Sequence, residues 1–151
     1  MVEPLVMHPE TLFSLASLLV LPGWVLLVFA PRWRWSARMV GPVLIPALLG
    51  ALYLVLVAAR WGGAEGGFGS LADVRRLFAD PYLLLAGWIH YLAFDLFLGS
   101  WEVRDAQRHS VPHLLVVPSL VLTFLFGPVG LLLYLAIRWM RARRLLVDEG
   151  R

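Results

Sequence analysis

Long apolar runs separated by short polar stretches dominate the chain. The runs cover residues 11–30, 40–59, 82–101 and 112–137. A helix needs roughly 20 mostly apolar residues to cross about 30 Å of hydrocarbon, and each run reaches that length. The pattern therefore predicts four membrane-spanning helices in one domain of residues 1–151.

Helix breakers interrupt these runs without ending their apolar character. Pro22-Gly23 lies in the middle of the first run, and the sequence FGPVG at 126–130 divides the last. Such breaks are tolerated in membranes where neighbouring helices satisfy the freed carbonyls, so we expect kinks.

The loop between the second and third runs begins with a Gly-rich connector at 60–70. The next stretch, SLADVRRLFADP, predicts a short amphipathic helix in the membrane interface, with Ser70 as its N-cap. Its apolar face is Leu71, Val74, Leu77 and Phe78. The predicted fold class is all-α: an integral membrane four-helix bundle with kinked helices and a short interfacial amphipathic helix.

Composition agrees with a membrane protein. Of 151 residues, 60% are hydrophobic and 15% charged, which excludes an ordinary soluble enzyme and a disordered tail. The absence of Cys excludes disulfides and thiolate sites. The basic residues are all Arg and flank the apolar runs, so we expect membrane lipid and no nucleic acid as partner. A homo-oligomer is left open.

Arginine placement gives a first prediction of orientation. If all four runs cross the membrane, eight arginines lie on the side of both termini and five on the other. This favours both termini in the cytoplasm. The N-terminus lacks the basic region of a signal peptide, so we expect the first run to remain as a helix. All-Arg usage points to a bacterial cytoplasmic membrane.

The third run is the one that carries ionisable residues at depth, His90 and Asp95. Such residues are functional candidates by default. Helical spacing places Trp88, Tyr91, Asp95 and Glu102 on one face, with His90 about 140° away from Asp95. If the helix continues beyond this run, its polar face also takes in residues 105 and 109.

Three interpretations of these polar residues compete. In the first, they perform acid/base chemistry without a cofactor, on a lipid-soluble substrate. The catalytic candidates are Asp95, His90, Glu102, Asp105 and His109. In the second, Glu102, Asp105, His109 and His113 bind a metal, although the spacing lacks Glu-x-x-His and HExxH, so no metal ligand is assigned. In the third, Asp95 pairs with Arg104 or a backbone amide, and residues 102–108 form a solvated loop.

A break at FGPVG that faced Asp95 would open a pocket for a long apolar ligand. The candidate substrate-binding residues are Trp88, Tyr91, Phe94, Trp101, Thr123, Phe126 and Tyr134.

The combination of HYLAFDLFLGSWE…D with FGPVG…Y, within residues 88–135, resembles the core of the ABA4-like family. The start LFSLASLLVLPGWVLLVFAP is similar to that family's first helix. The positions that match the family pattern are His90, Asp95, Gly99, Glu102, Asp105, Pro128, Gly130 and Tyr134. The resemblance implies a four-helix membrane protein. Plant members are chloroplast proteins needed to convert violaxanthin to neoxanthin, a redox-neutral isomerisation in which an epoxide opens and a nearby carbon loses a proton.

Two functional hypotheses follow. The first is a carotenoid-modifying isomerase, or an accessory to one, with Asp95 as acid and Glu102, Asp105 or His90 as base. The alternative is a non-catalytic membrane scaffold, or a pigment- or lipid-binding protein that assists another enzyme. A transporter or channel is weaker, because four spans need to oligomerise to form a pore.

Overall fold

The structure is a computed structural model that describes residues 7–142. Within that range it is all-α, as predicted, and contains no strand. The six α-helices, with one π-helix (η1) and one 3₁₀ turn (η2), are α1 (Pro9–Phe29), η1 (Ser36–Leu44), α2 (Ile45–Arg60), η2 (Trp61–Gly63), α3 (Leu71–Leu77), α4 (Pro81–Arg108), α5 (His113–Phe126) and α6 (Pro128–Ala142).

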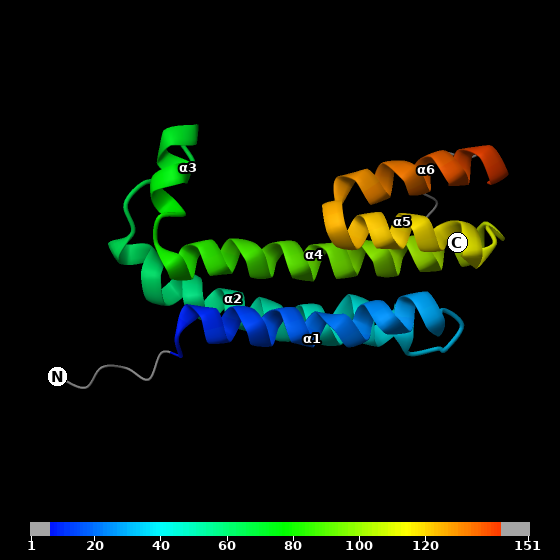
Figure 1. The fold of residues 1–151 in the computed structure, drawn as a ribbon, viewed down its shortest axis with the longest axis horizontal. Helices are drawn as coiled ribbons and strands as arrows, with labels where there is room; N and C mark the ends of the chain where they lie inside the picture. The colour runs from blue at the N-terminus through cyan, green and yellow to red at the C-terminus, as the bar shows by residue number, and fades with distance from the viewer. Residues whose placement is uncertain (1–6, 143–151) are drawn as a thin grey trace.

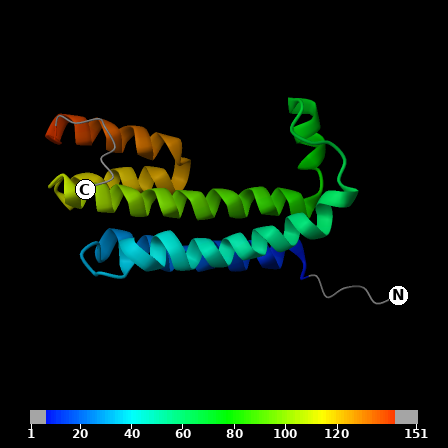
Figure 2. The same cartoon turned by 180° about the vertical axis from the view of Figure 1, so that it is seen from behind.

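Three helical segments are long and apolar enough to cross a membrane. They are Pro9–Phe29 with 21 residues, Ser36–Gly63 with 28 and Pro81–Arg108 with 28. They lie side by side, with α4 packed against both α1 and α2 (Figures 1 and 2). Large apolar side chains such as Leu18, Leu54 and Phe94 are exposed on their outer faces, as expected for surfaces that contact lipid.

Small residues let these helices approach closely. A Cβ on Gly23, which follows Pro22 inside α1, would lie 2.8 Å from a methyl carbon of Leu96 on α4. A Cβ on Gly41 of η1 would lie 2.2 Å from Ser100 Oγ, also on α4. Such small-residue contacts allow the close backbone packing that favours helix association in membranes.

The segment predicted as one kinked span at 112–137 is two helices, so that prediction is wrong. The break at FGPVG is present, but the chain turns back at Gly127, whose φ is +41°. The antiparallel α5 and α6 form a hairpin against one half of α4 (Figure 1). The physical reason is that Gly adopts positive φ at little cost, while the following Pro128 can begin a new helix because its first turn needs no N–H donor.

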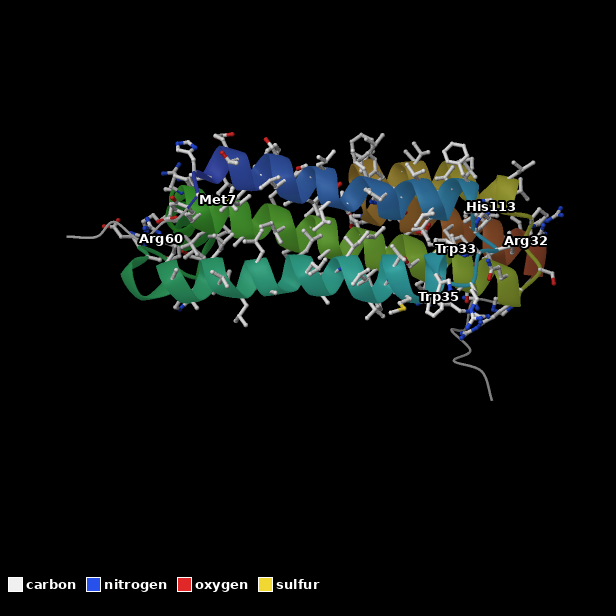
Figure 3. All side chains as sticks on the ribbon, turned by 90° about the horizontal axis from the view of Figure 1, so that it is seen from below. Met7, Arg32, Trp33, Trp35, Arg60 and His113 are labelled. Carbon is white, nitrogen blue, oxygen red and sulfur yellow. The ribbon has the colours of Figure 1, made fainter. Side chains whose placement is uncertain are left out.

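This hairpin changes which end of the molecule each segment occupies. Met7 and Arg60 lie at one end of the bundle, and Arg32, Trp33, Trp35 and His113 at the other (Figure 3). The last turn of α6 lies at the same end of the bundle as Arg32, and the start of α1 lies at the other end (Figure 1). The prediction that both termini lie in the cytoplasm assumed a fourth full crossing, which the hairpin replaces, and the termini themselves lie outside the described residues.

The short amphipathic helix is present as α3 and lies across the axis of α4 (Figure 1). Ser70 Oγ caps it by accepting a hydrogen bond from Asp73 N at 3.1 Å. The next helix, α4, is capped by Asp80, which accepts hydrogen bonds from the backbone N–H groups of Tyr82 and Leu83. Arg60 Nη2 lies 2.7 Å from Asp80 Oδ2. Partial burial raises the pKa of Asp80, but the hydrogen bonds from Arg60 and the two amides outweigh it, so the net shift of the pKa is downward.

Candidate functional site

The polar candidates lie on α4, which continues well beyond the apolar run. The helix has 28 residues, about 42 Å at 1.5 Å per residue, and ends at Arg108. Glu102 and Asp105 are therefore helical and buried, with 0% and 2% of their surface exposed. The alternative of a solvated loop is wrong for these two residues. The polar face of α4 is turned toward the α5–α6 hairpin.

Asp105 forms the most densely bonded part of this face. The Tyr134 hydroxyl donates to Asp105 Oδ2 at 2.5 Å, and Arg138 Nε lies 3.0 Å from the same oxygen. His109 Nε2 lies 3.5 Å from Asp105 Oδ1 and accepts a hydrogen bond from Arg138 Nη2 at 2.8 Å. We call these four residues the buried lock. It joins α4 to α6 and pairs the buried carboxylate with a cation.

Sequence reasoning missed Arg138, which is 0% exposed. The signal was present: Arg138 follows Tyr134 by one helical turn in an otherwise apolar run. An arginine at that spacing lies on the same helix face as the tyrosine, and a buried arginine requires an acidic partner.

Glu102 lies beside the lock and has a sparser environment. Thr123 Oγ1 on α5 donates to Glu102 Oε1 at 2.9 Å. Glu102 Oε2 is buried without a hydrogen-bond partner among the described residues, and so is Ser119 Oγ on α5. Buried polar atoms without a partner are uncommon and are often satisfied by internal water.

Asp95 lies where the hairpin ends. It is half-buried, and a Cβ on Gly127 would come within 2.8 Å of Asp95 Oδ1, so the carboxyl group contacts the turn between α5 and α6. Its Oδ2 is buried without a hydrogen-bond partner in the described part of the chain. The pairing with Arg104 is wrong, because the Arg104 guanidinium donates to the Ala37 carbonyl at 2.6 Å.

Tyr91 connects Asp95 to the uncovered half of α4. Its hydroxyl donates to the Phe124 carbonyl at 3.0 Å and lies close enough to the Asp95 carboxyl to interact with it. Phe124 is in the last turn of α5, so this bond also fixes the end of the hairpin.

An apolar cavity of about 610 Å³ begins at Tyr91, in the region that the hairpin leaves uncovered. We call it the slot. It lies between α1, α3 and α4, and its residues are Pro9, Glu10, Phe13, Phe78, Pro81, Leu84, Leu85, Gly87, Trp88 and Tyr91. Trp88 stacks on Tyr91 with ring centroids 5.3 Å apart and donates from Nε1 to Ser17 Oγ at 3.1 Å. Its aromatic lining and its volume are typical of a site for an apolar ligand.

His90 and Phe94 face a different cavity. Their rings stack with centroids 4.4 Å apart and line a space of about 300 Å³ between α2 and α4. His90 is thus on another face of α4 from Asp95, as the helical spacing predicted.

The remaining candidates lie at the hairpin. Trp101 packs edge-on against Tyr134 with ring centroids 5.5 Å apart, and Thr123 is engaged with Glu102. Phe126 is exposed at the turn. Of the proposed substrate-binding residues, Trp88 and Tyr91 line the slot.

The proposed metal set is not assembled. Across residues 7–142, no three His, Cys, Asp or Glu side chains come together as metal ligands. His113, the fourth member of that set, instead donates from Nε2 to the Val28 carbonyl at 2.9 Å.

Comparisons with known proteins give a consistent assignment. A family model described as ABA DEFICIENT 4-like matches residues 11–134. Among curated proteins, the chain is similar to Protein ABA DEFICIENT 4, chloroplastic, from Arabidopsis thaliana, with 25% identity over 130 residues. The aligned region is 81% of this chain but 58% of that relative, so the chain spans less than two thirds of the relative's length. No solved structure matches the chain. The family match extends from α1 through Tyr134 of the buried lock and includes both Asp95 and Glu102, and the chain belongs to the ABA4-like family.

Proposed function

We propose that the chain is a membrane isomerase that acts on a carotenoid or another isoprenoid by acid/base chemistry, with Asp95 as the acid. The observation that carries this proposal is that the half-buried Asp95 carboxyl, with one oxygen lacking a partner among residues 7–142, adjoins Tyr91 at the end of the slot. An apolar chain with a polar oxygen near its end would enter the slot from the bilayer and meet this carboxyl group.

The proposed chemistry is redox-neutral and balanced. Asp95 gives its proton to an epoxide oxygen, and the C–O bond opens so that the oxygen becomes a hydroxyl. A carboxylate then removes a proton from a carbon near the opened ring, and the electrons of the C–H bond form the new double bond. Net transfer is one proton in and one proton out, so the product has the same mass as the substrate.

Glu102 is the second carboxyl group that we assign to proton exchange. It follows Asp95 by two helical turns on the same face, and its Oε2 has no partner in the described region. Asp105 is a weaker candidate, because Tyr134 and Arg138 already engage its Oδ2. His90 lies at the other cavity.

The test is pigment analysis in a host that produces epoxy-carotenoids. Wild type should convert a pigment into an isomer of equal mass, and Asp95→Asn, which keeps shape but cannot act as an acid, should abolish the conversion. Asp73→Asn on α3 is the matched control, because it removes a carboxylate outside the slot and should leave conversion unchanged. Leu84→Trp, which fills the slot, should reduce conversion together with pigment binding.

The alternative of a pigment- or lipid-binding accessory gives a different result. Pigment would then copurify with wild type and with Asp95→Asn equally, and no isomer would form. Conversion that survived Asp95→Asn would remove Asp95 from the acid role.

A further inference from the structure

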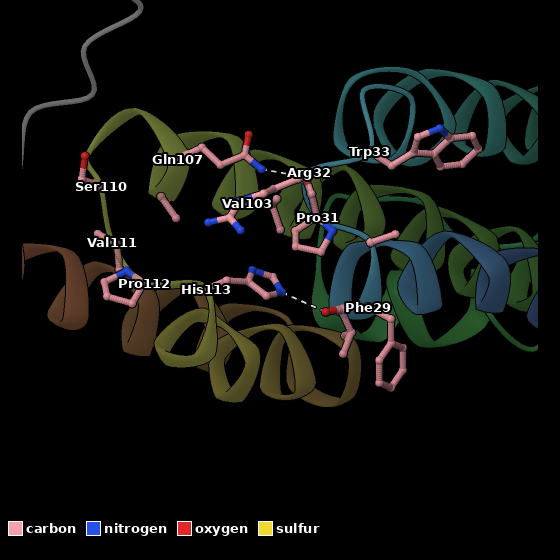
Figure 4. Close-up of a pocket in the computed structure, with 13 residues that line it drawn as sticks. Phe29, Pro31, Arg32, Trp33, Val103, Gln107, Ser110, Val111, Pro112 and His113 are labelled. Atoms are coloured by element: carbon pink, nitrogen blue, oxygen red, sulfur yellow. Dashed lines mark hydrogen bonds between the residues drawn. The ribbon is translucent and has the colours of Figure 1, made fainter.

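A third and larger cavity lies at the opposite end of the bundle from the slot. It measures about 880 Å³ and is formed where the loop after α1 meets the end of α4 and the start of α5 (Figure 4). Its lining is residues 28–33, with Val103, Ala106, Gln107 and residues 110–113. None of the residues assigned to proton transfer lines it, so it is independent of the proposed function.

Two side-chain bonds hold its walls in place. Gln107 Nε2 donates to the Pro31 carbonyl at 2.6 Å, which ties the loop to α4. His113 Nε2 donates to the Val28 carbonyl at 2.9 Å, which ties the end of α1 to α5. Figure 4 shows both bonds on either side of the opening. Because these hydrogen bonds hold the walls together, the cavity is formed before any ligand binds, which lowers the entropic cost of ordering it on binding.

Arg32 extends into this cavity between Gln107 and His113 (Figure 4). It makes no hydrogen bond or ion pair with any residue in 7–142. Its neighbours are already engaged: Arg34 lies over the Trp35 ring at 4.8 Å, and Arg104 donates to the Ala37 carbonyl. Arg32 is therefore a guanidinium whose donors remain available to a ligand.

The surface around the cavity is strongly basic. Arg34 follows Arg32 in the same loop, Arg38, Arg104 and Arg108 line an adjacent pocket that shares Gln107 with this cavity, and Arg141 lies in the last turn of α6. The described acidic residues here, Glu102 and Asp105, are buried inside the bundle. The other described end carries four acidic residues, Glu10, Glu65, Asp73 and Asp80, against three arginines, of which Arg60 pairs with Asp80 and Arg76 with Asp73. A ligand that is attracted to this end is therefore an anion.

The cavity also has an apolar side at the end of α1, a helix long and apolar enough to cross a membrane. Phe29 in its wall is 81% exposed, and Val28, Pro31, Val111 and Pro112 complete this border. A free anion would leave this surface unused, whereas a lipid would place its chains along it. Guanidinium groups bind phosphate by parallel hydrogen bonds and are suited to this position.

We propose that this cavity binds the phosphodiester headgroup of an anionic membrane lipid, with Arg32 as the phosphate-binding residue and the acyl chains along the end of α1. Clusters of arginines beside membrane helices attract anionic lipids electrostatically, which brings the headgroup to the cavity. Arg32 then adds a specific contact to that general attraction.

The test measures lipid binding to the purified full chain by native mass spectrometry, with phosphatidylglycerol, phosphatidylcholine and glycerol phosphate as probes. Wild type should prefer phosphatidylglycerol over phosphatidylcholine. Arg32→Gln should weaken phosphatidylglycerol binding about tenfold, the effect of one lost charge-assisted contact. Arg34→Gln is the matched control. It removes the same charge from a side chain that lies two residues after Arg32 and does not line the cavity. It should therefore change binding less than about twofold.

Each other outcome overturns the proposal. Equal weakening by Arg32→Gln and Arg34→Gln would mean that surface charge alone attracts lipid. Tight binding of glycerol phosphate in competition with phosphatidylglycerol would mean a site for a soluble phosphate. If wild type bound phosphatidylglycerol and phosphatidylcholine equally, the negative charge of the headgroup would not contribute to binding. Arg32 is exposed and unbonded within residues 7–142, so Arg32→Gln should unfold at the wild-type temperature, and that measurement confirms that lost binding is not lost folding.

Discussion

The buried lock predicts a large free-energy coupling between Asp105 and Arg138. Both side chains are almost fully buried, at 2% and 0% exposure, and Arg138 Nε lies 3.0 Å from Asp105 Oδ2. Removal of one partner leaves the other charge buried without compensation, at a cost of about 3–5 kcal/mol. Arg138→Met keeps most of the side-chain volume and removes the charge. The loss of stability should therefore come from the Asp105 carboxylate, which stays buried without its cation.

The double variant separates the ion pair from packing. Asp105→Leu together with Arg138→Met removes both charges, and a buried ion pair replaced by apolar groups is often neutral. The double variant should therefore be more stable than either single variant, with a coupling free energy of about 2–3 kcal/mol. Tyr134 limits the recovery, because its hydroxyl loses the carboxylate that accepts its hydrogen bond.

The assay is equilibrium unfolding in mixed micelles of a mild detergent and sodium dodecyl sulfate, followed by tryptophan fluorescence. Arg141→Met, on the same helix but exposed, is the control and should change stability by less than about 0.5 kcal/mol. Additive losses in the double variant would refute the reasoning, because they would show that the two charges do not stabilise each other. A single variant as stable as wild type would refute the burial of the pair.

Three further predictions address the hairpin, the cap of α4 and the orientation. Gly130→Ala should destabilise by about 1–3 kcal/mol in the same unfolding assay, because its Cβ would lie 2.1 Å from the α5 backbone, whereas Gly50→Ala has open space and should be neutral or stabilising. Because the folded-state pKa of Asp80 is lowered, its stabilisation is complete above pH about 4 and is lost as pH falls through the folded-state pKa, so the difference in melting temperature between wild type and Asp80→Asn should vanish in strong acid. A membrane-impermeant maleimide on intact cells should label Met7→Cys but not Arg34→Cys, because arginine-rich ends of membrane helices generally face the cytoplasm. The reverse labelling would contradict this predicted orientation.

The sequence was sufficient for the three long apolar helices and for the polar face of α4. Apolar runs of about 20 residues specify membrane helices because the bilayer leaves few other ways to satisfy backbone groups. Helical spacing then correctly separated Asp95 from His90, because the Asp95 carboxyl contacts the turn at Gly127 and His90 lines the cavity between α2 and α4. The cap at Ser70 was predictable for a similar reason, since it depends on side chains three residues apart.

The direction of the chain after Phe126 could not be predicted in this way. Hydropathy measures how apolar a run is, and it is the same whether the chain continues or turns back. The FGPVG break fits a kink as well as a turn, and the choice depends on contacts between distant segments. One such contact is the ion pair between Arg138 and Asp105, which forms in the structure where α6 returns along α4. The predicted orientation of the termini depended on the same assumption of a fourth full crossing.

The point along α4 at which the hairpin ends determines how far Asp95 is covered. From the turn at Gly127 toward the C-terminal end of α4, the helices α5 and α6 cover the polar face of α4. Glu102 and Asp105 are therefore shielded from lipid. Toward the N-terminal end of α4 the same face is not covered by the hairpin, and Trp88 and Tyr91 line the slot there. Asp95 lies at the boundary, where its carboxyl contacts the turn and adjoins Tyr91. A hairpin longer by one turn on each helix would cover Tyr91 and close that end of the slot, and a shorter one would expose Glu102 to lipid. The length of α5 therefore sets where a substrate from the bilayer can reach a proton-bearing group.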